Sequence, residues 1–560
     1  MHQPDQTPRK SVFYDYQVFP FQTPPEMTGA APRHPVVIIG AGPIGMLLAL
    51  ELAQQKVASV IIESEAQISH GSRAIVLTRR TLEILQQAGV DAPFVEKGLP
   101  WQFGRSFYQG TEVYKMVMPY DENDRFMPGL NIQQQYIEEF LVAAIAASPY
   151  AEIRWQTRFV SLDQDPDGVT LTLDTPQGEY ALQADWCVAS DGGRSAVRKQ
   201  LGLRMTGDAY PGNFVIADIL APIDLPTERQ CHFDPQWNPG NNVLVHRQPD
   251  GLWRLDFRLP DGESPEQALA EESLTERINL ILEMIGQPVN WTLDWATVYS
   301  ANALTLPDYR QGRVLFCGDA AHVLPIFGVR GANTGAQDAQ NLAWKLALVA
   351  QGAAGPRLLD SYSHERVKAA LEICGEAGKS TRFMSPPTRG YRLLRDAVLS
   401  FSLSESFAKD FMHWRTSRPH DYVDSPLNAP QDDNQILKGG MPNGAPAGNV
   451  KLGADDFLLD HCGPQFVILV FAVGGQLTAA QQDILQLRMP APIAVKTIAI
   501  GARADAADES LPDPNGKIGL RFGLPEGGVY VLRPDQHVCG RWVMADRDTV
   551  AAAIQNAVSA

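Results

Sequence analysis

Three glycines and one acidic residue near the N-terminus have the spacing of a dinucleotide-binding turn. Gly40, Gly42 and Gly45 follow the apolar run 36–39, and a Leu/Ala-rich helical stretch comes next. Glycines here permit a tight turn, close backbone approach to a pyrophosphate and close helix packing, and the helix N-terminus offers N–H groups to phosphates. The next apolar run ends at Glu63, whose carboxylate can accept hydrogen bonds from ribose hydroxyls. This order of elements predicts a bound dinucleotide.

Two later segments carry residues that suit the same kind of ligand. Asp191 follows the apolar run 187–189 and precedes two glycines, where a strand gives way to a helix. Open α/β sheets bind ligands at the carboxyl ends of their strands, so Asp191 could accept from a sugar hydroxyl, although an ordinary Asp-Gly turn is the alternative. Asp319 also ends a strand, and the glycine-rich loop 328–335 leads into a helix whose N-terminus can hold an anion or polarise a carbonyl.

Length and composition limit the classes of protein that this chain can be. The 560 residues exceed one compact core, and 44% hydrophobic with 20% charged residues indicates a globular protein of two to four domains. The net charge of −17 argues against nucleic acid and anionic membranes as partners. Six scattered cysteines without a CxxC pair suggest a reducing cytoplasm and no zinc or other metal site. We expect no membrane span and no signal peptide, since no apolar run is long enough.

Pattern and composition divide the chain into parts. Residues 1–34 are rich in proline, and their aromatic side chains suggest that part of this irregular extension docks on a surface. Short apolar runs broken by Pro, Gly and Asn predict a mainly antiparallel sheet over 205–300. The predicted parts are an extension (1–34), a discontinuous α/β unit (35–204 and 301–415), an inserted β-sheet domain (205–300), a linker (416–449) and a small α/β domain (450–560).

In order and spacing, the three ligand-binding segments resemble those of flavoprotein monooxygenases similar to para-hydroxybenzoate hydroxylase, over about residues 35–400. The resemblance implies a Rossmann-like FAD/NAD(P)-binding domain of the glutathione-reductase type, with an inserted, mainly antiparallel substrate domain. The run 531–538 resembles the thioredoxin-like tail of the branch that includes phenol, 3-(3-hydroxyphenyl)propionate and polyketide hydroxylases. That tail normally lacks a redox CxxC pair, so we interpret Cys462 and Cys539 as structural.

The resemblance also implies which residues contact FAD. Gly40, Gly42 and Gly45 would flank the pyrophosphate, and Glu63 would bind the adenosine ribose. Arg73 would lie near the phosphates or the isoalloxazine entry, and Gln134 would touch the flavin side. Asp191 belongs to a segment also linked to NAD(P)H, and Asp319 would bind the ribityl chain. The backbone of Gly331, Ala332 and Asn333 would contact the pyrimidine edge of the flavin.

The implied activity is that of a FAD-dependent, NAD(P)H-consuming monooxygenase that hydroxylates a phenolic substrate with molecular oxygen through a flavin hydroperoxide. A cytoplasmic homodimer is expected, and the choice between NADH and NADPH stays open. An epoxidase or Baeyer–Villiger-type oxygenase on the same scaffold, or a flavin-binding protein without turnover, are the alternatives. A flavin halogenase is disfavoured because residues 291–295 read WTLDW rather than the WxWxIP of that family.

Substrate and catalytic residues are less well defined by the sequence. Candidates to hold the substrate or its proton are Tyr210, His232, His246, Arg247, Arg254 and Arg258. We hypothesise that His246 and Arg247 together hold a substrate carboxylate. The catalytic candidates are His322, which the family usually treats as structural, Pro325 and Arg330. Ile326 stands where the family usually has a second proline, and Arg330 where it commonly has glutamine or lysine.

Overall fold

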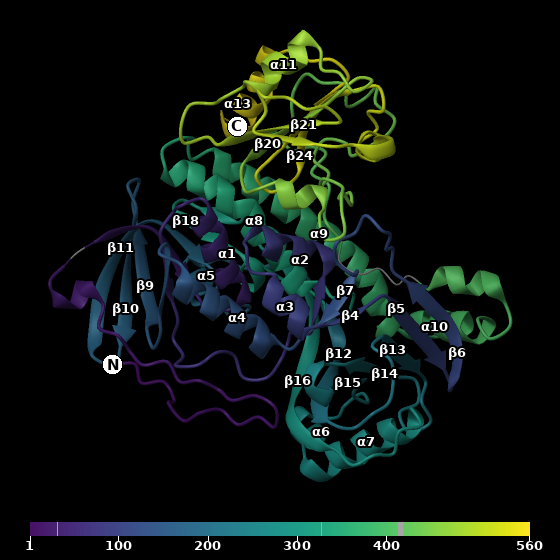
Figure 1. Ribbon diagram of the computed structural model, residues 1–560. Coiled ribbons are helices and arrows are strands. Elements are labelled where there is room, and N and C mark those ends of the chain that lie inside the picture. Colours follow the sequence, from purple (N-terminus) through teal and green to yellow (C-terminus); the bar gives the residue numbers. More distant parts are fainter. Residues whose placement is uncertain (31, 326, 413–417, 560) are drawn as a thin grey trace.

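The computed structural model describes residues 1–30, 32–325, 327–412 and 418–559. A mixed sheet with a parallel centre and flanking helices, a second large sheet beside it, and a C-terminal α/β unit on top make up the molecule (Figure 1). This is the predicted mixed α/β fold. Irregular chain in the N-terminal extension is interrupted by the short helix η1 (Pro25–Thr28).

The first sheet brings together strands from distant parts of the chain. Its order is β17 (Arg310–Gln311), β18 (Val314–Phe316), β11 (Gly178–Ala189), β1 (Arg33–Ile39), β2 (Ser59–Ile62) and β8 (Ala151–Arg154), with β10 (Val169–Thr175) and β9 (Arg158–Gln164) beside β11. β1 pairs in parallel with β2 and β11, and β11 pairs in parallel with β18. The carboxyl ends of these strands, at Ile39, Ala189 and Phe316, therefore lie next to one another.

Helices cover this sheet because packing against it removes their apolar side chains from water. α1 (Pro43–Gln54) is buried from Gly45 to Leu52 and contacts both α4 (Gln134–Ala147) and α8 (Gly331–Ala350). The remaining elements of this unit are α2 (Arg79–Gln87), α3 (Ala92–Lys97), α5 (Ala196–Gln200), α9 (Leu358–Met384), η3 (Gly318–Ala320) and a small sheet of β3 (Val76–Thr78), β7 (Gly129–Asn131) and β4 (Leu99–Trp101).

The second sheet is mainly antiparallel, as predicted. Its order is β19 (His322–Val323), β16 (Thr292–Thr305), β12 (Thr206–Leu220), β15 (Leu252–Arg258), β14 (Asn242–Arg247), β13 (Arg229–Phe233), β5 (Phe103–Tyr108) and β6 (Thr111–Val117). The sequence pattern places residues 103–117 in the first unit, but in the structure they extend this second sheet, with β5 parallel to β13. Alternate side chains form an outer face, whose apolar cluster is shared with α7 (Glu271–Met284), and an inner face toward the first unit.

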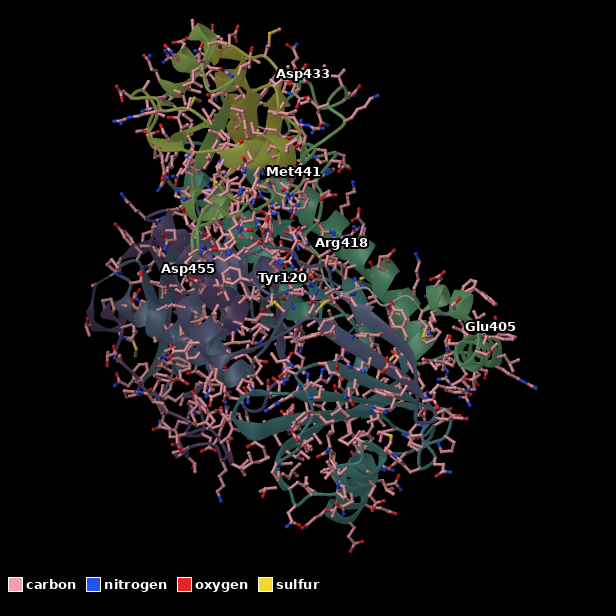
Figure 2. The ribbon with its side chains drawn as sticks, turned by 45° about the vertical axis from the view of Figure 1, so that its right-hand side comes forward. Tyr120, Glu405, Arg418, Asp433, Met441 and Asp455 are labelled. Carbon is pink, nitrogen blue, oxygen red and sulfur yellow. The ribbon has the colours of Figure 1, made fainter. Side chains whose placement is uncertain are left out.

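The C-terminal unit packs on helices of the first unit. Its sheet is β22 (Glu509–Leu511), β21 (Val495–Ile500), β20 (Phe466–Phe471), β23 (Gly528–Leu532) and β24 (Val538–Trp542), flanked by α11 (Ala479–Leu485), α12 (Lys517–Arg521) and α13 (Arg547–Ser559). Trp344 of α8 joins its apolar core. The labelled Arg418 lies near the first unit and Asp433 beside the C-terminal unit, so the predicted linker runs along both (Figure 2).

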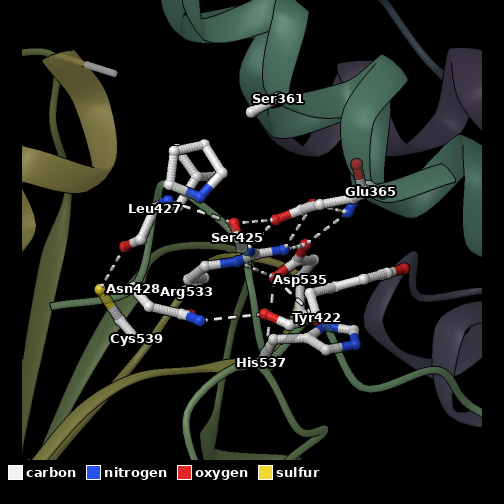
Figure 3. Close-up of polar contacts among 12 residues, drawn as sticks. Ser361, Glu365, Tyr422, Ser425, Leu427, Asn428, Arg533, Asp535, His537 and Cys539 are labelled. Atoms are coloured by element: carbon white, nitrogen blue, oxygen red, sulfur yellow. Dashed lines mark hydrogen bonds and ion pairs between the residues drawn. The ribbon is translucent and has the colours of Figure 1, made fainter. Parts of the chain in front are cut away.

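Buried charges hold this interface together. Arg533 contacts Glu365 of α9 at 2.6 Å and Asp535 at 2.5 Å (Figure 3). Lys345 of α8 contacts Glu365 at 2.7 Å. These side chains have no exposed surface. Because a buried charge is stable only when it is paired, the C-terminal unit and the two helices fix each other's position.

Three further features complete the fold. α6 (Pro265–Ala268) precedes α7, and α10 (Arg389–Phe401) and η4 (Ser406–Phe411) project from the end of α9 (Figure 1). In the part of the chain that the structure describes, the six cysteines form no disulfide. Within those same residues, every helix is too short or too polar to span a bilayer.

Candidate cofactor site

The β1–α1 turn has the shape that its glycines predict. Gly40 has φ of +106°, and a Cβ there would lie 2.6 Å from the carbonyl oxygen of Ser190. A Cβ at Gly45 would lie 2.2 Å from the carbonyl oxygen of Gly40. Gly42 differs, because a Cβ there would meet no described atom within 4 Å. Gly40 and Gly45 are thus required by the fold itself, whereas Gly42 leaves open room above the helix N-terminus.

A pocket of about 280 Å³ opens at this turn. Gly42, Glu63, Arg73 and Gln134 all line it, so four predicted cofactor residues from separate segments meet there. Glu63 is half-buried and accepts hydrogen bonds from the backbone N–H groups of Ala41 and Glu65, both at 2.9 Å. Desolvation raises the pKa of Glu63, and these two hydrogen bonds oppose the rise.

Gln134 holds the loop that carries Arg73. Its Oε1 accepts from the backbone N–H groups of Arg73 at 3.1 Å and Ala74 at 3.2 Å, and its Nε2 donates to Glu138 at 2.7 Å. The Ser72 hydroxyl in turn accepts from the backbone N–H of Gln134 at 2.8 Å. Gln134 therefore positions the exposed Arg73 at the pocket, in addition to lining the pocket itself.

Asp191 lies directly beside the glycine turn. A Cβ at Gly40 would be 3.1 Å from the Cα of Asp191. One carboxylate oxygen accepts from the backbone N–H of Ala196 at 2.7 Å and of Val197 at 3.2 Å, which orders the start of α5. The other oxygen, Oδ1, is buried and has no hydrogen-bond partner in the part of the chain that the structure describes. The structural and the ligand-binding interpretations of Asp191 are therefore compatible, since each uses a different oxygen.

Asp319 and the loop before α8 close the third side. Ile44 of α1 would contact a Cβ at either Gly318 or Gly335, so this segment packs against the glycine turn. Asp319 is partly exposed, yet the surrounding protein desolvates its carboxyl group and raises its pKa. The charges of His322 and Arg73 oppose this rise. The three predicted segments thus meet at the carboxyl edge of the first sheet, where α/β folds bind dinucleotides.

The first turn of α8 has free donors. No side chain among the described residues caps it, and a Cβ at Gly331 would meet open space. The Asn333 side chain is committed to β3, because its Oδ1 accepts from the Thr78 backbone N–H at 2.8 Å and its Nδ2 donates to Val76 at 2.9 Å. The backbone of residues 331–333, rather than the Asn333 side chain, is therefore what this turn offers to a ligand.

The catalytic candidates occupy buried positions. His322 has no exposed surface and bonds Asp338 at 2.7 Å, which makes it a residue that shapes the loop. Pro325 and Arg330 are also buried. Ile326 lies outside the described residues. Asp338 and Arg366 were missed by sequence reasoning, because the buried part of α8 around Asp338 carries other polar residues, among them Gln337, Gln340 and Asn341.

The substrate candidates do not converge on one place. His246 lies on the inner face, where the strand register aligns it with Arg229 and Arg254. Arg247 points to the outer face, where it donates to the carbonyl of Leu225 at 3.0 Å and covers Trp253. Adjacent strand residues alternate between faces, so the joint carboxylate site hypothesised for His246 and Arg247 is not formed.

The other candidates also separate. His232 stacks on Phe107, with ring centroids 4.5 Å apart, and burial lowers its pKa to about 4. Tyr210 packs near α9, since a Cβ at Gly378 would lie 2.6 Å from its hydroxyl. Arg254 binds Asp218 through two hydrogen bonds of 2.8 and 2.7 Å and donates to the carbonyl of Ser72, which joins the inner face to the Arg73 loop. Arg258 donates to Asn241 at 2.5 Å and to Asp261 at 2.9 Å.

One inner-face carboxyl was not predicted. Asp256 lies 3.7 Å from His246, and burial raises its pKa to about 7. Burial also keeps the pKa of His246 well below its usual value, with Arg229 and Arg254 acting in the same direction. Within the described residues, Oδ1 of Asp256 and Nδ1 of His246 are buried without a hydrogen-bond partner. Two polar atoms on one buried face are thus available to a small polar molecule.

The residues present fit FAD. An open glycine, a carboxylate at the end of β2, an arginine at the pocket and the uncapped α8 turn are the groups that a pyrophosphate, a ribose and a flavin ring need. In agreement, the model of a family described as "FAD binding domain" matches residues 33–377.

Known proteins resemble this chain in sequence and in fold. A 3-(3-hydroxy-phenyl)propionate/3-hydroxycinnamic acid hydroxylase of Mycolicibacterium smegmatis is 30% identical over 365 residues, which span 65% of this chain and 64% of that protein. The Escherichia coli K12 protein of the same name is 27% identical over 523 residues, 90% of this chain and 91% of that protein. The solved structure of aklavinone-11 hydroxylase with FAD and aklavinone has a TM-score of 0.74 and 25% identity, covering 94% of this chain and 99% of that one.

Proposed function

The chain belongs to the FAD binding domain family, and we propose that it is a FAD-dependent, NAD(P)H-consuming monooxygenase that hydroxylates a phenolic substrate. One observation carries the proposal. The glycine turn, Asp191 and the Asp319 segment meet at the carboxyl edge of the first sheet, and the inner face of the second sheet joins them through Arg254 and Ser72. A cofactor site and a shielded polar face therefore adjoin each other.

The bound FAD would supply the oxygen-activating chemistry, and the chain's residues would orient the reactants and exclude water. Glu63, Arg73 and the first turn of α8 would hold the dinucleotide, and Gln134 would hold Arg73 in place. Phe214 of the inner face packs on Phe327, with ring centroids 5.2 Å apart, which brings apolar surface of the second sheet against the loop before α8.

On the inner face, Asp256 and His246 would bind the phenolic hydroxyl. Their buried unpartnered atoms, Oδ1 and Nδ1, supply an acceptor and a second polar contact. A carboxyl with a pKa of about 7 can take the proton of a phenol near neutral pH, which makes the ring more electron-rich. The names of the relatives support a phenol that carries an acidic side chain as the first substrate to test.

The proposal extends to location and assembly. The acidic net charge and the scattered cysteines support a cytoplasmic protein. A homodimer is supported by exposed apolar side chains on α10 and η4, among them Leu393, Leu394 and Phe407 at 58–60% exposure. Glu405 marks this projection in Figure 2. Light scattering during size-exclusion chromatography would give the molar mass of the particle, which distinguishes a single chain from a dimer.

The activity is tested with purified protein and a panel of phenols and phenolic acids. The proposal expects bound flavin in the visible spectrum, and NAD(P)H oxidation that one phenol class accelerates, with a product heavier by one oxygen atom. An epoxide or an inserted ring oxygen in that product would identify the alternative oxygenase chemistry. Bound flavin with no accelerated oxidation by any phenol would contradict the proposed hydroxylase.

A further inference from the structure

The N-terminal segment docks on the wall of the cofactor pocket. Residues 2–19, here called the strap, run along the loop 64–71 that follows β2 (Figure 1). The backbone N–H of Phe19 donates to Ala66 at 2.8 Å, and the Phe19 ring stacks on Trp155 at 4.2 Å. Trp155 itself lines the pocket. The aromatic residues of this segment thus dock on a surface, and that surface is the pocket wall.

Buried hydrogen bonds fix the middle of the strap. The Tyr16 hydroxyl donates to Ser69 at 3.3 Å and accepts from the Gly71 backbone N–H at 3.3 Å. The Ser11 hydroxyl donates to Asp294 of β16 at 2.6 Å. Tyr16 is 7% exposed, and desolvation raises its pKa. The strap is therefore a docked element that spans the first unit and the second sheet.

Arg9 is the strap residue that reaches the pocket. Its backbone N–H donates to Gln67 at 3.0 Å, its Nη2 contacts Glu65 at 2.8 Å, and its Nη1 donates to the carbonyl of Ile68. Arg9 lines the pocket together with Gly42 and Glu63. Its side chain keeps 24% exposure, so its protein partners do not enclose it fully.

The charges of the pocket explain why a cation is needed there. Glu63, Glu65 and Glu138 line it, and a pyrophosphate would add two negative charges. Arg73 and Arg9 are the arginines in the lining. Arg73 also acts on Asp319, whose pKa its charge lowers. Arg73 therefore divides its charge between the pocket and Asp319. Arg9 lies on the side of the pocket formed by Glu65 and Gln67, where it supplies a second guanidinium.

We propose that Arg9 is a cofactor-binding residue that acts on the ADP half of FAD, and that the strap forms the outer wall of this site. The proposal rests on the family's binding of FAD and on none of the substrate assignments. A guanidinium suits this role because it donates to two phosphate oxygens at once. The competing explanation is that Arg9 only anchors the strap through Glu65.

The test compares two flavins on the stripped protein. FAD and riboflavin, which lacks the ADP half, are titrated against apoprotein, and flavin fluorescence gives each dissociation constant. Arg9→Gln is expected to weaken FAD about tenfold, as loss of a charge-assisted hydrogen bond does, and to leave riboflavin unchanged. Lys10→Gln, which alters the exposed neighbouring cation, should bind both flavins as the wild type does.

A second variant separates direct binding from anchoring. Glu65→Gln breaks the ion pair but keeps Arg9, so FAD should bind as tightly as in the wild type or more tightly. If Glu65→Gln weakens FAD as much as Arg9→Gln does, Arg9 is an anchor and the proposal is overturned. An unchanged ratio of the two dissociation constants in Arg9→Gln overturns it as well, and this ratio is independent of any loss of folded protein.

Discussion

The carboxylate of Asp338 and the imidazole of His322 are joined by a 2.7 Å hydrogen bond in a place where neither has exposed surface. The same Asp338 oxygen accepts from the backbone N–H of Gly318 at 3.1 Å, and its other oxygen accepts from Arg366 at 2.6 Å. Arg366 continues to the Tyr422 hydroxyl at 2.8 Å. A chain of buried polar contacts thus links the loop at the cofactor site to the segment that leads to the C-terminal unit.

Asp338→Asn should destabilise the protein strongly, because it leaves the guanidinium of Arg366 buried without its counter-charge. We expect the free energy of unfolding of the apoprotein, measured by urea denaturation, to fall by about 3–5 kcal/mol. The pKa of Asp338 is lowered, chiefly by Arg366 against desolvation, so its contribution is present at neutral pH and is lost as pH falls through the folded-state pKa. Asp360→Asn, on the exposed side of α9, should change little.

Gly42→Ala should separate cofactor binding from folding. Gly42 has φ of −73° and open space at the Cβ position, but it is also the N-cap of α1, so the stability of the apoprotein should change by less than about 1 kcal/mol. The added methyl group occupies the approach of a pyrophosphate, so the dissociation constant for FAD should rise at least tenfold. Unaltered FAD affinity in this variant would argue against the cradle assigned to this turn.

Gly40→Ala is the contrasting change at the same turn. Its φ of +106° and the 2.6 Å approach to Ser190 predict strain in the protein without any ligand. The apoprotein should therefore melt at a lower temperature, which differential scanning calorimetry measures directly. A normal melting temperature would show that the turn relaxes and that Gly40 is not required for folding.

Asp256 should make both stability and activity depend on pH. Its folded-state pKa of about 7 lies above its usual 3.8, so its ionisation costs stability as pH rises between these values. Asp256→Asn should therefore be more stable than the wild type at pH 8 and similar at pH 4. If Asp256 accepts the phenolic proton, kcat/KM of the wild type should rise with increasing pH, with an apparent pKa near 7. In Asp256→Asn this rise should be absent. The exposed Asp224→Asn serves as the control.

Glu365→Gln should loosen the C-terminal unit. Glu365 pairs with Arg533 and Lys345. Desolvation alone would raise its pKa, but the charges of these two cations outweigh it and lower the pKa. Removal of the charge leaves both cations underpaired, so limited proteolysis should cut the segment 418–449 faster than in the wild type. Asp360→Asn, an exposed position on the same helix that pairs with Arg310 outside this segment, should be cut at the wild-type rate.

The glycine turn and Glu63 were predictable because their geometry is local. Each depends on a short run of residues whose backbone conformation the residue types restrict. The meeting of this turn with Asp191 and Asp319 followed from parallel strands that end at one edge of a sheet. These parts of the site needed no knowledge of how side chains pack.

The remaining parts depend on long-range packing. His246 and Arg247 are neighbours in sequence, yet strand alternation places them on opposite faces, and applying that period to the pair would have separated them. Arg9 and Asp338 gave no local signal, because their partners lie 56 residues away at Glu65 and 28 residues away at Arg366. Buried ion pairs form only where the tertiary fold brings such segments together.

Oxygen transfer is the central claim, and isotope labelling tests it most directly. The purified protein is supplied with FAD, NAD(P)H, heavy-isotope oxygen gas and a phenolic acid that accelerates NAD(P)H oxidation. We predict a product that carries one additional hydroxyl group, with its oxygen derived from the gas and none from water. A product without the label, or oxidation of NAD(P)H that yields only hydrogen peroxide with every phenol in the panel, would contradict the account.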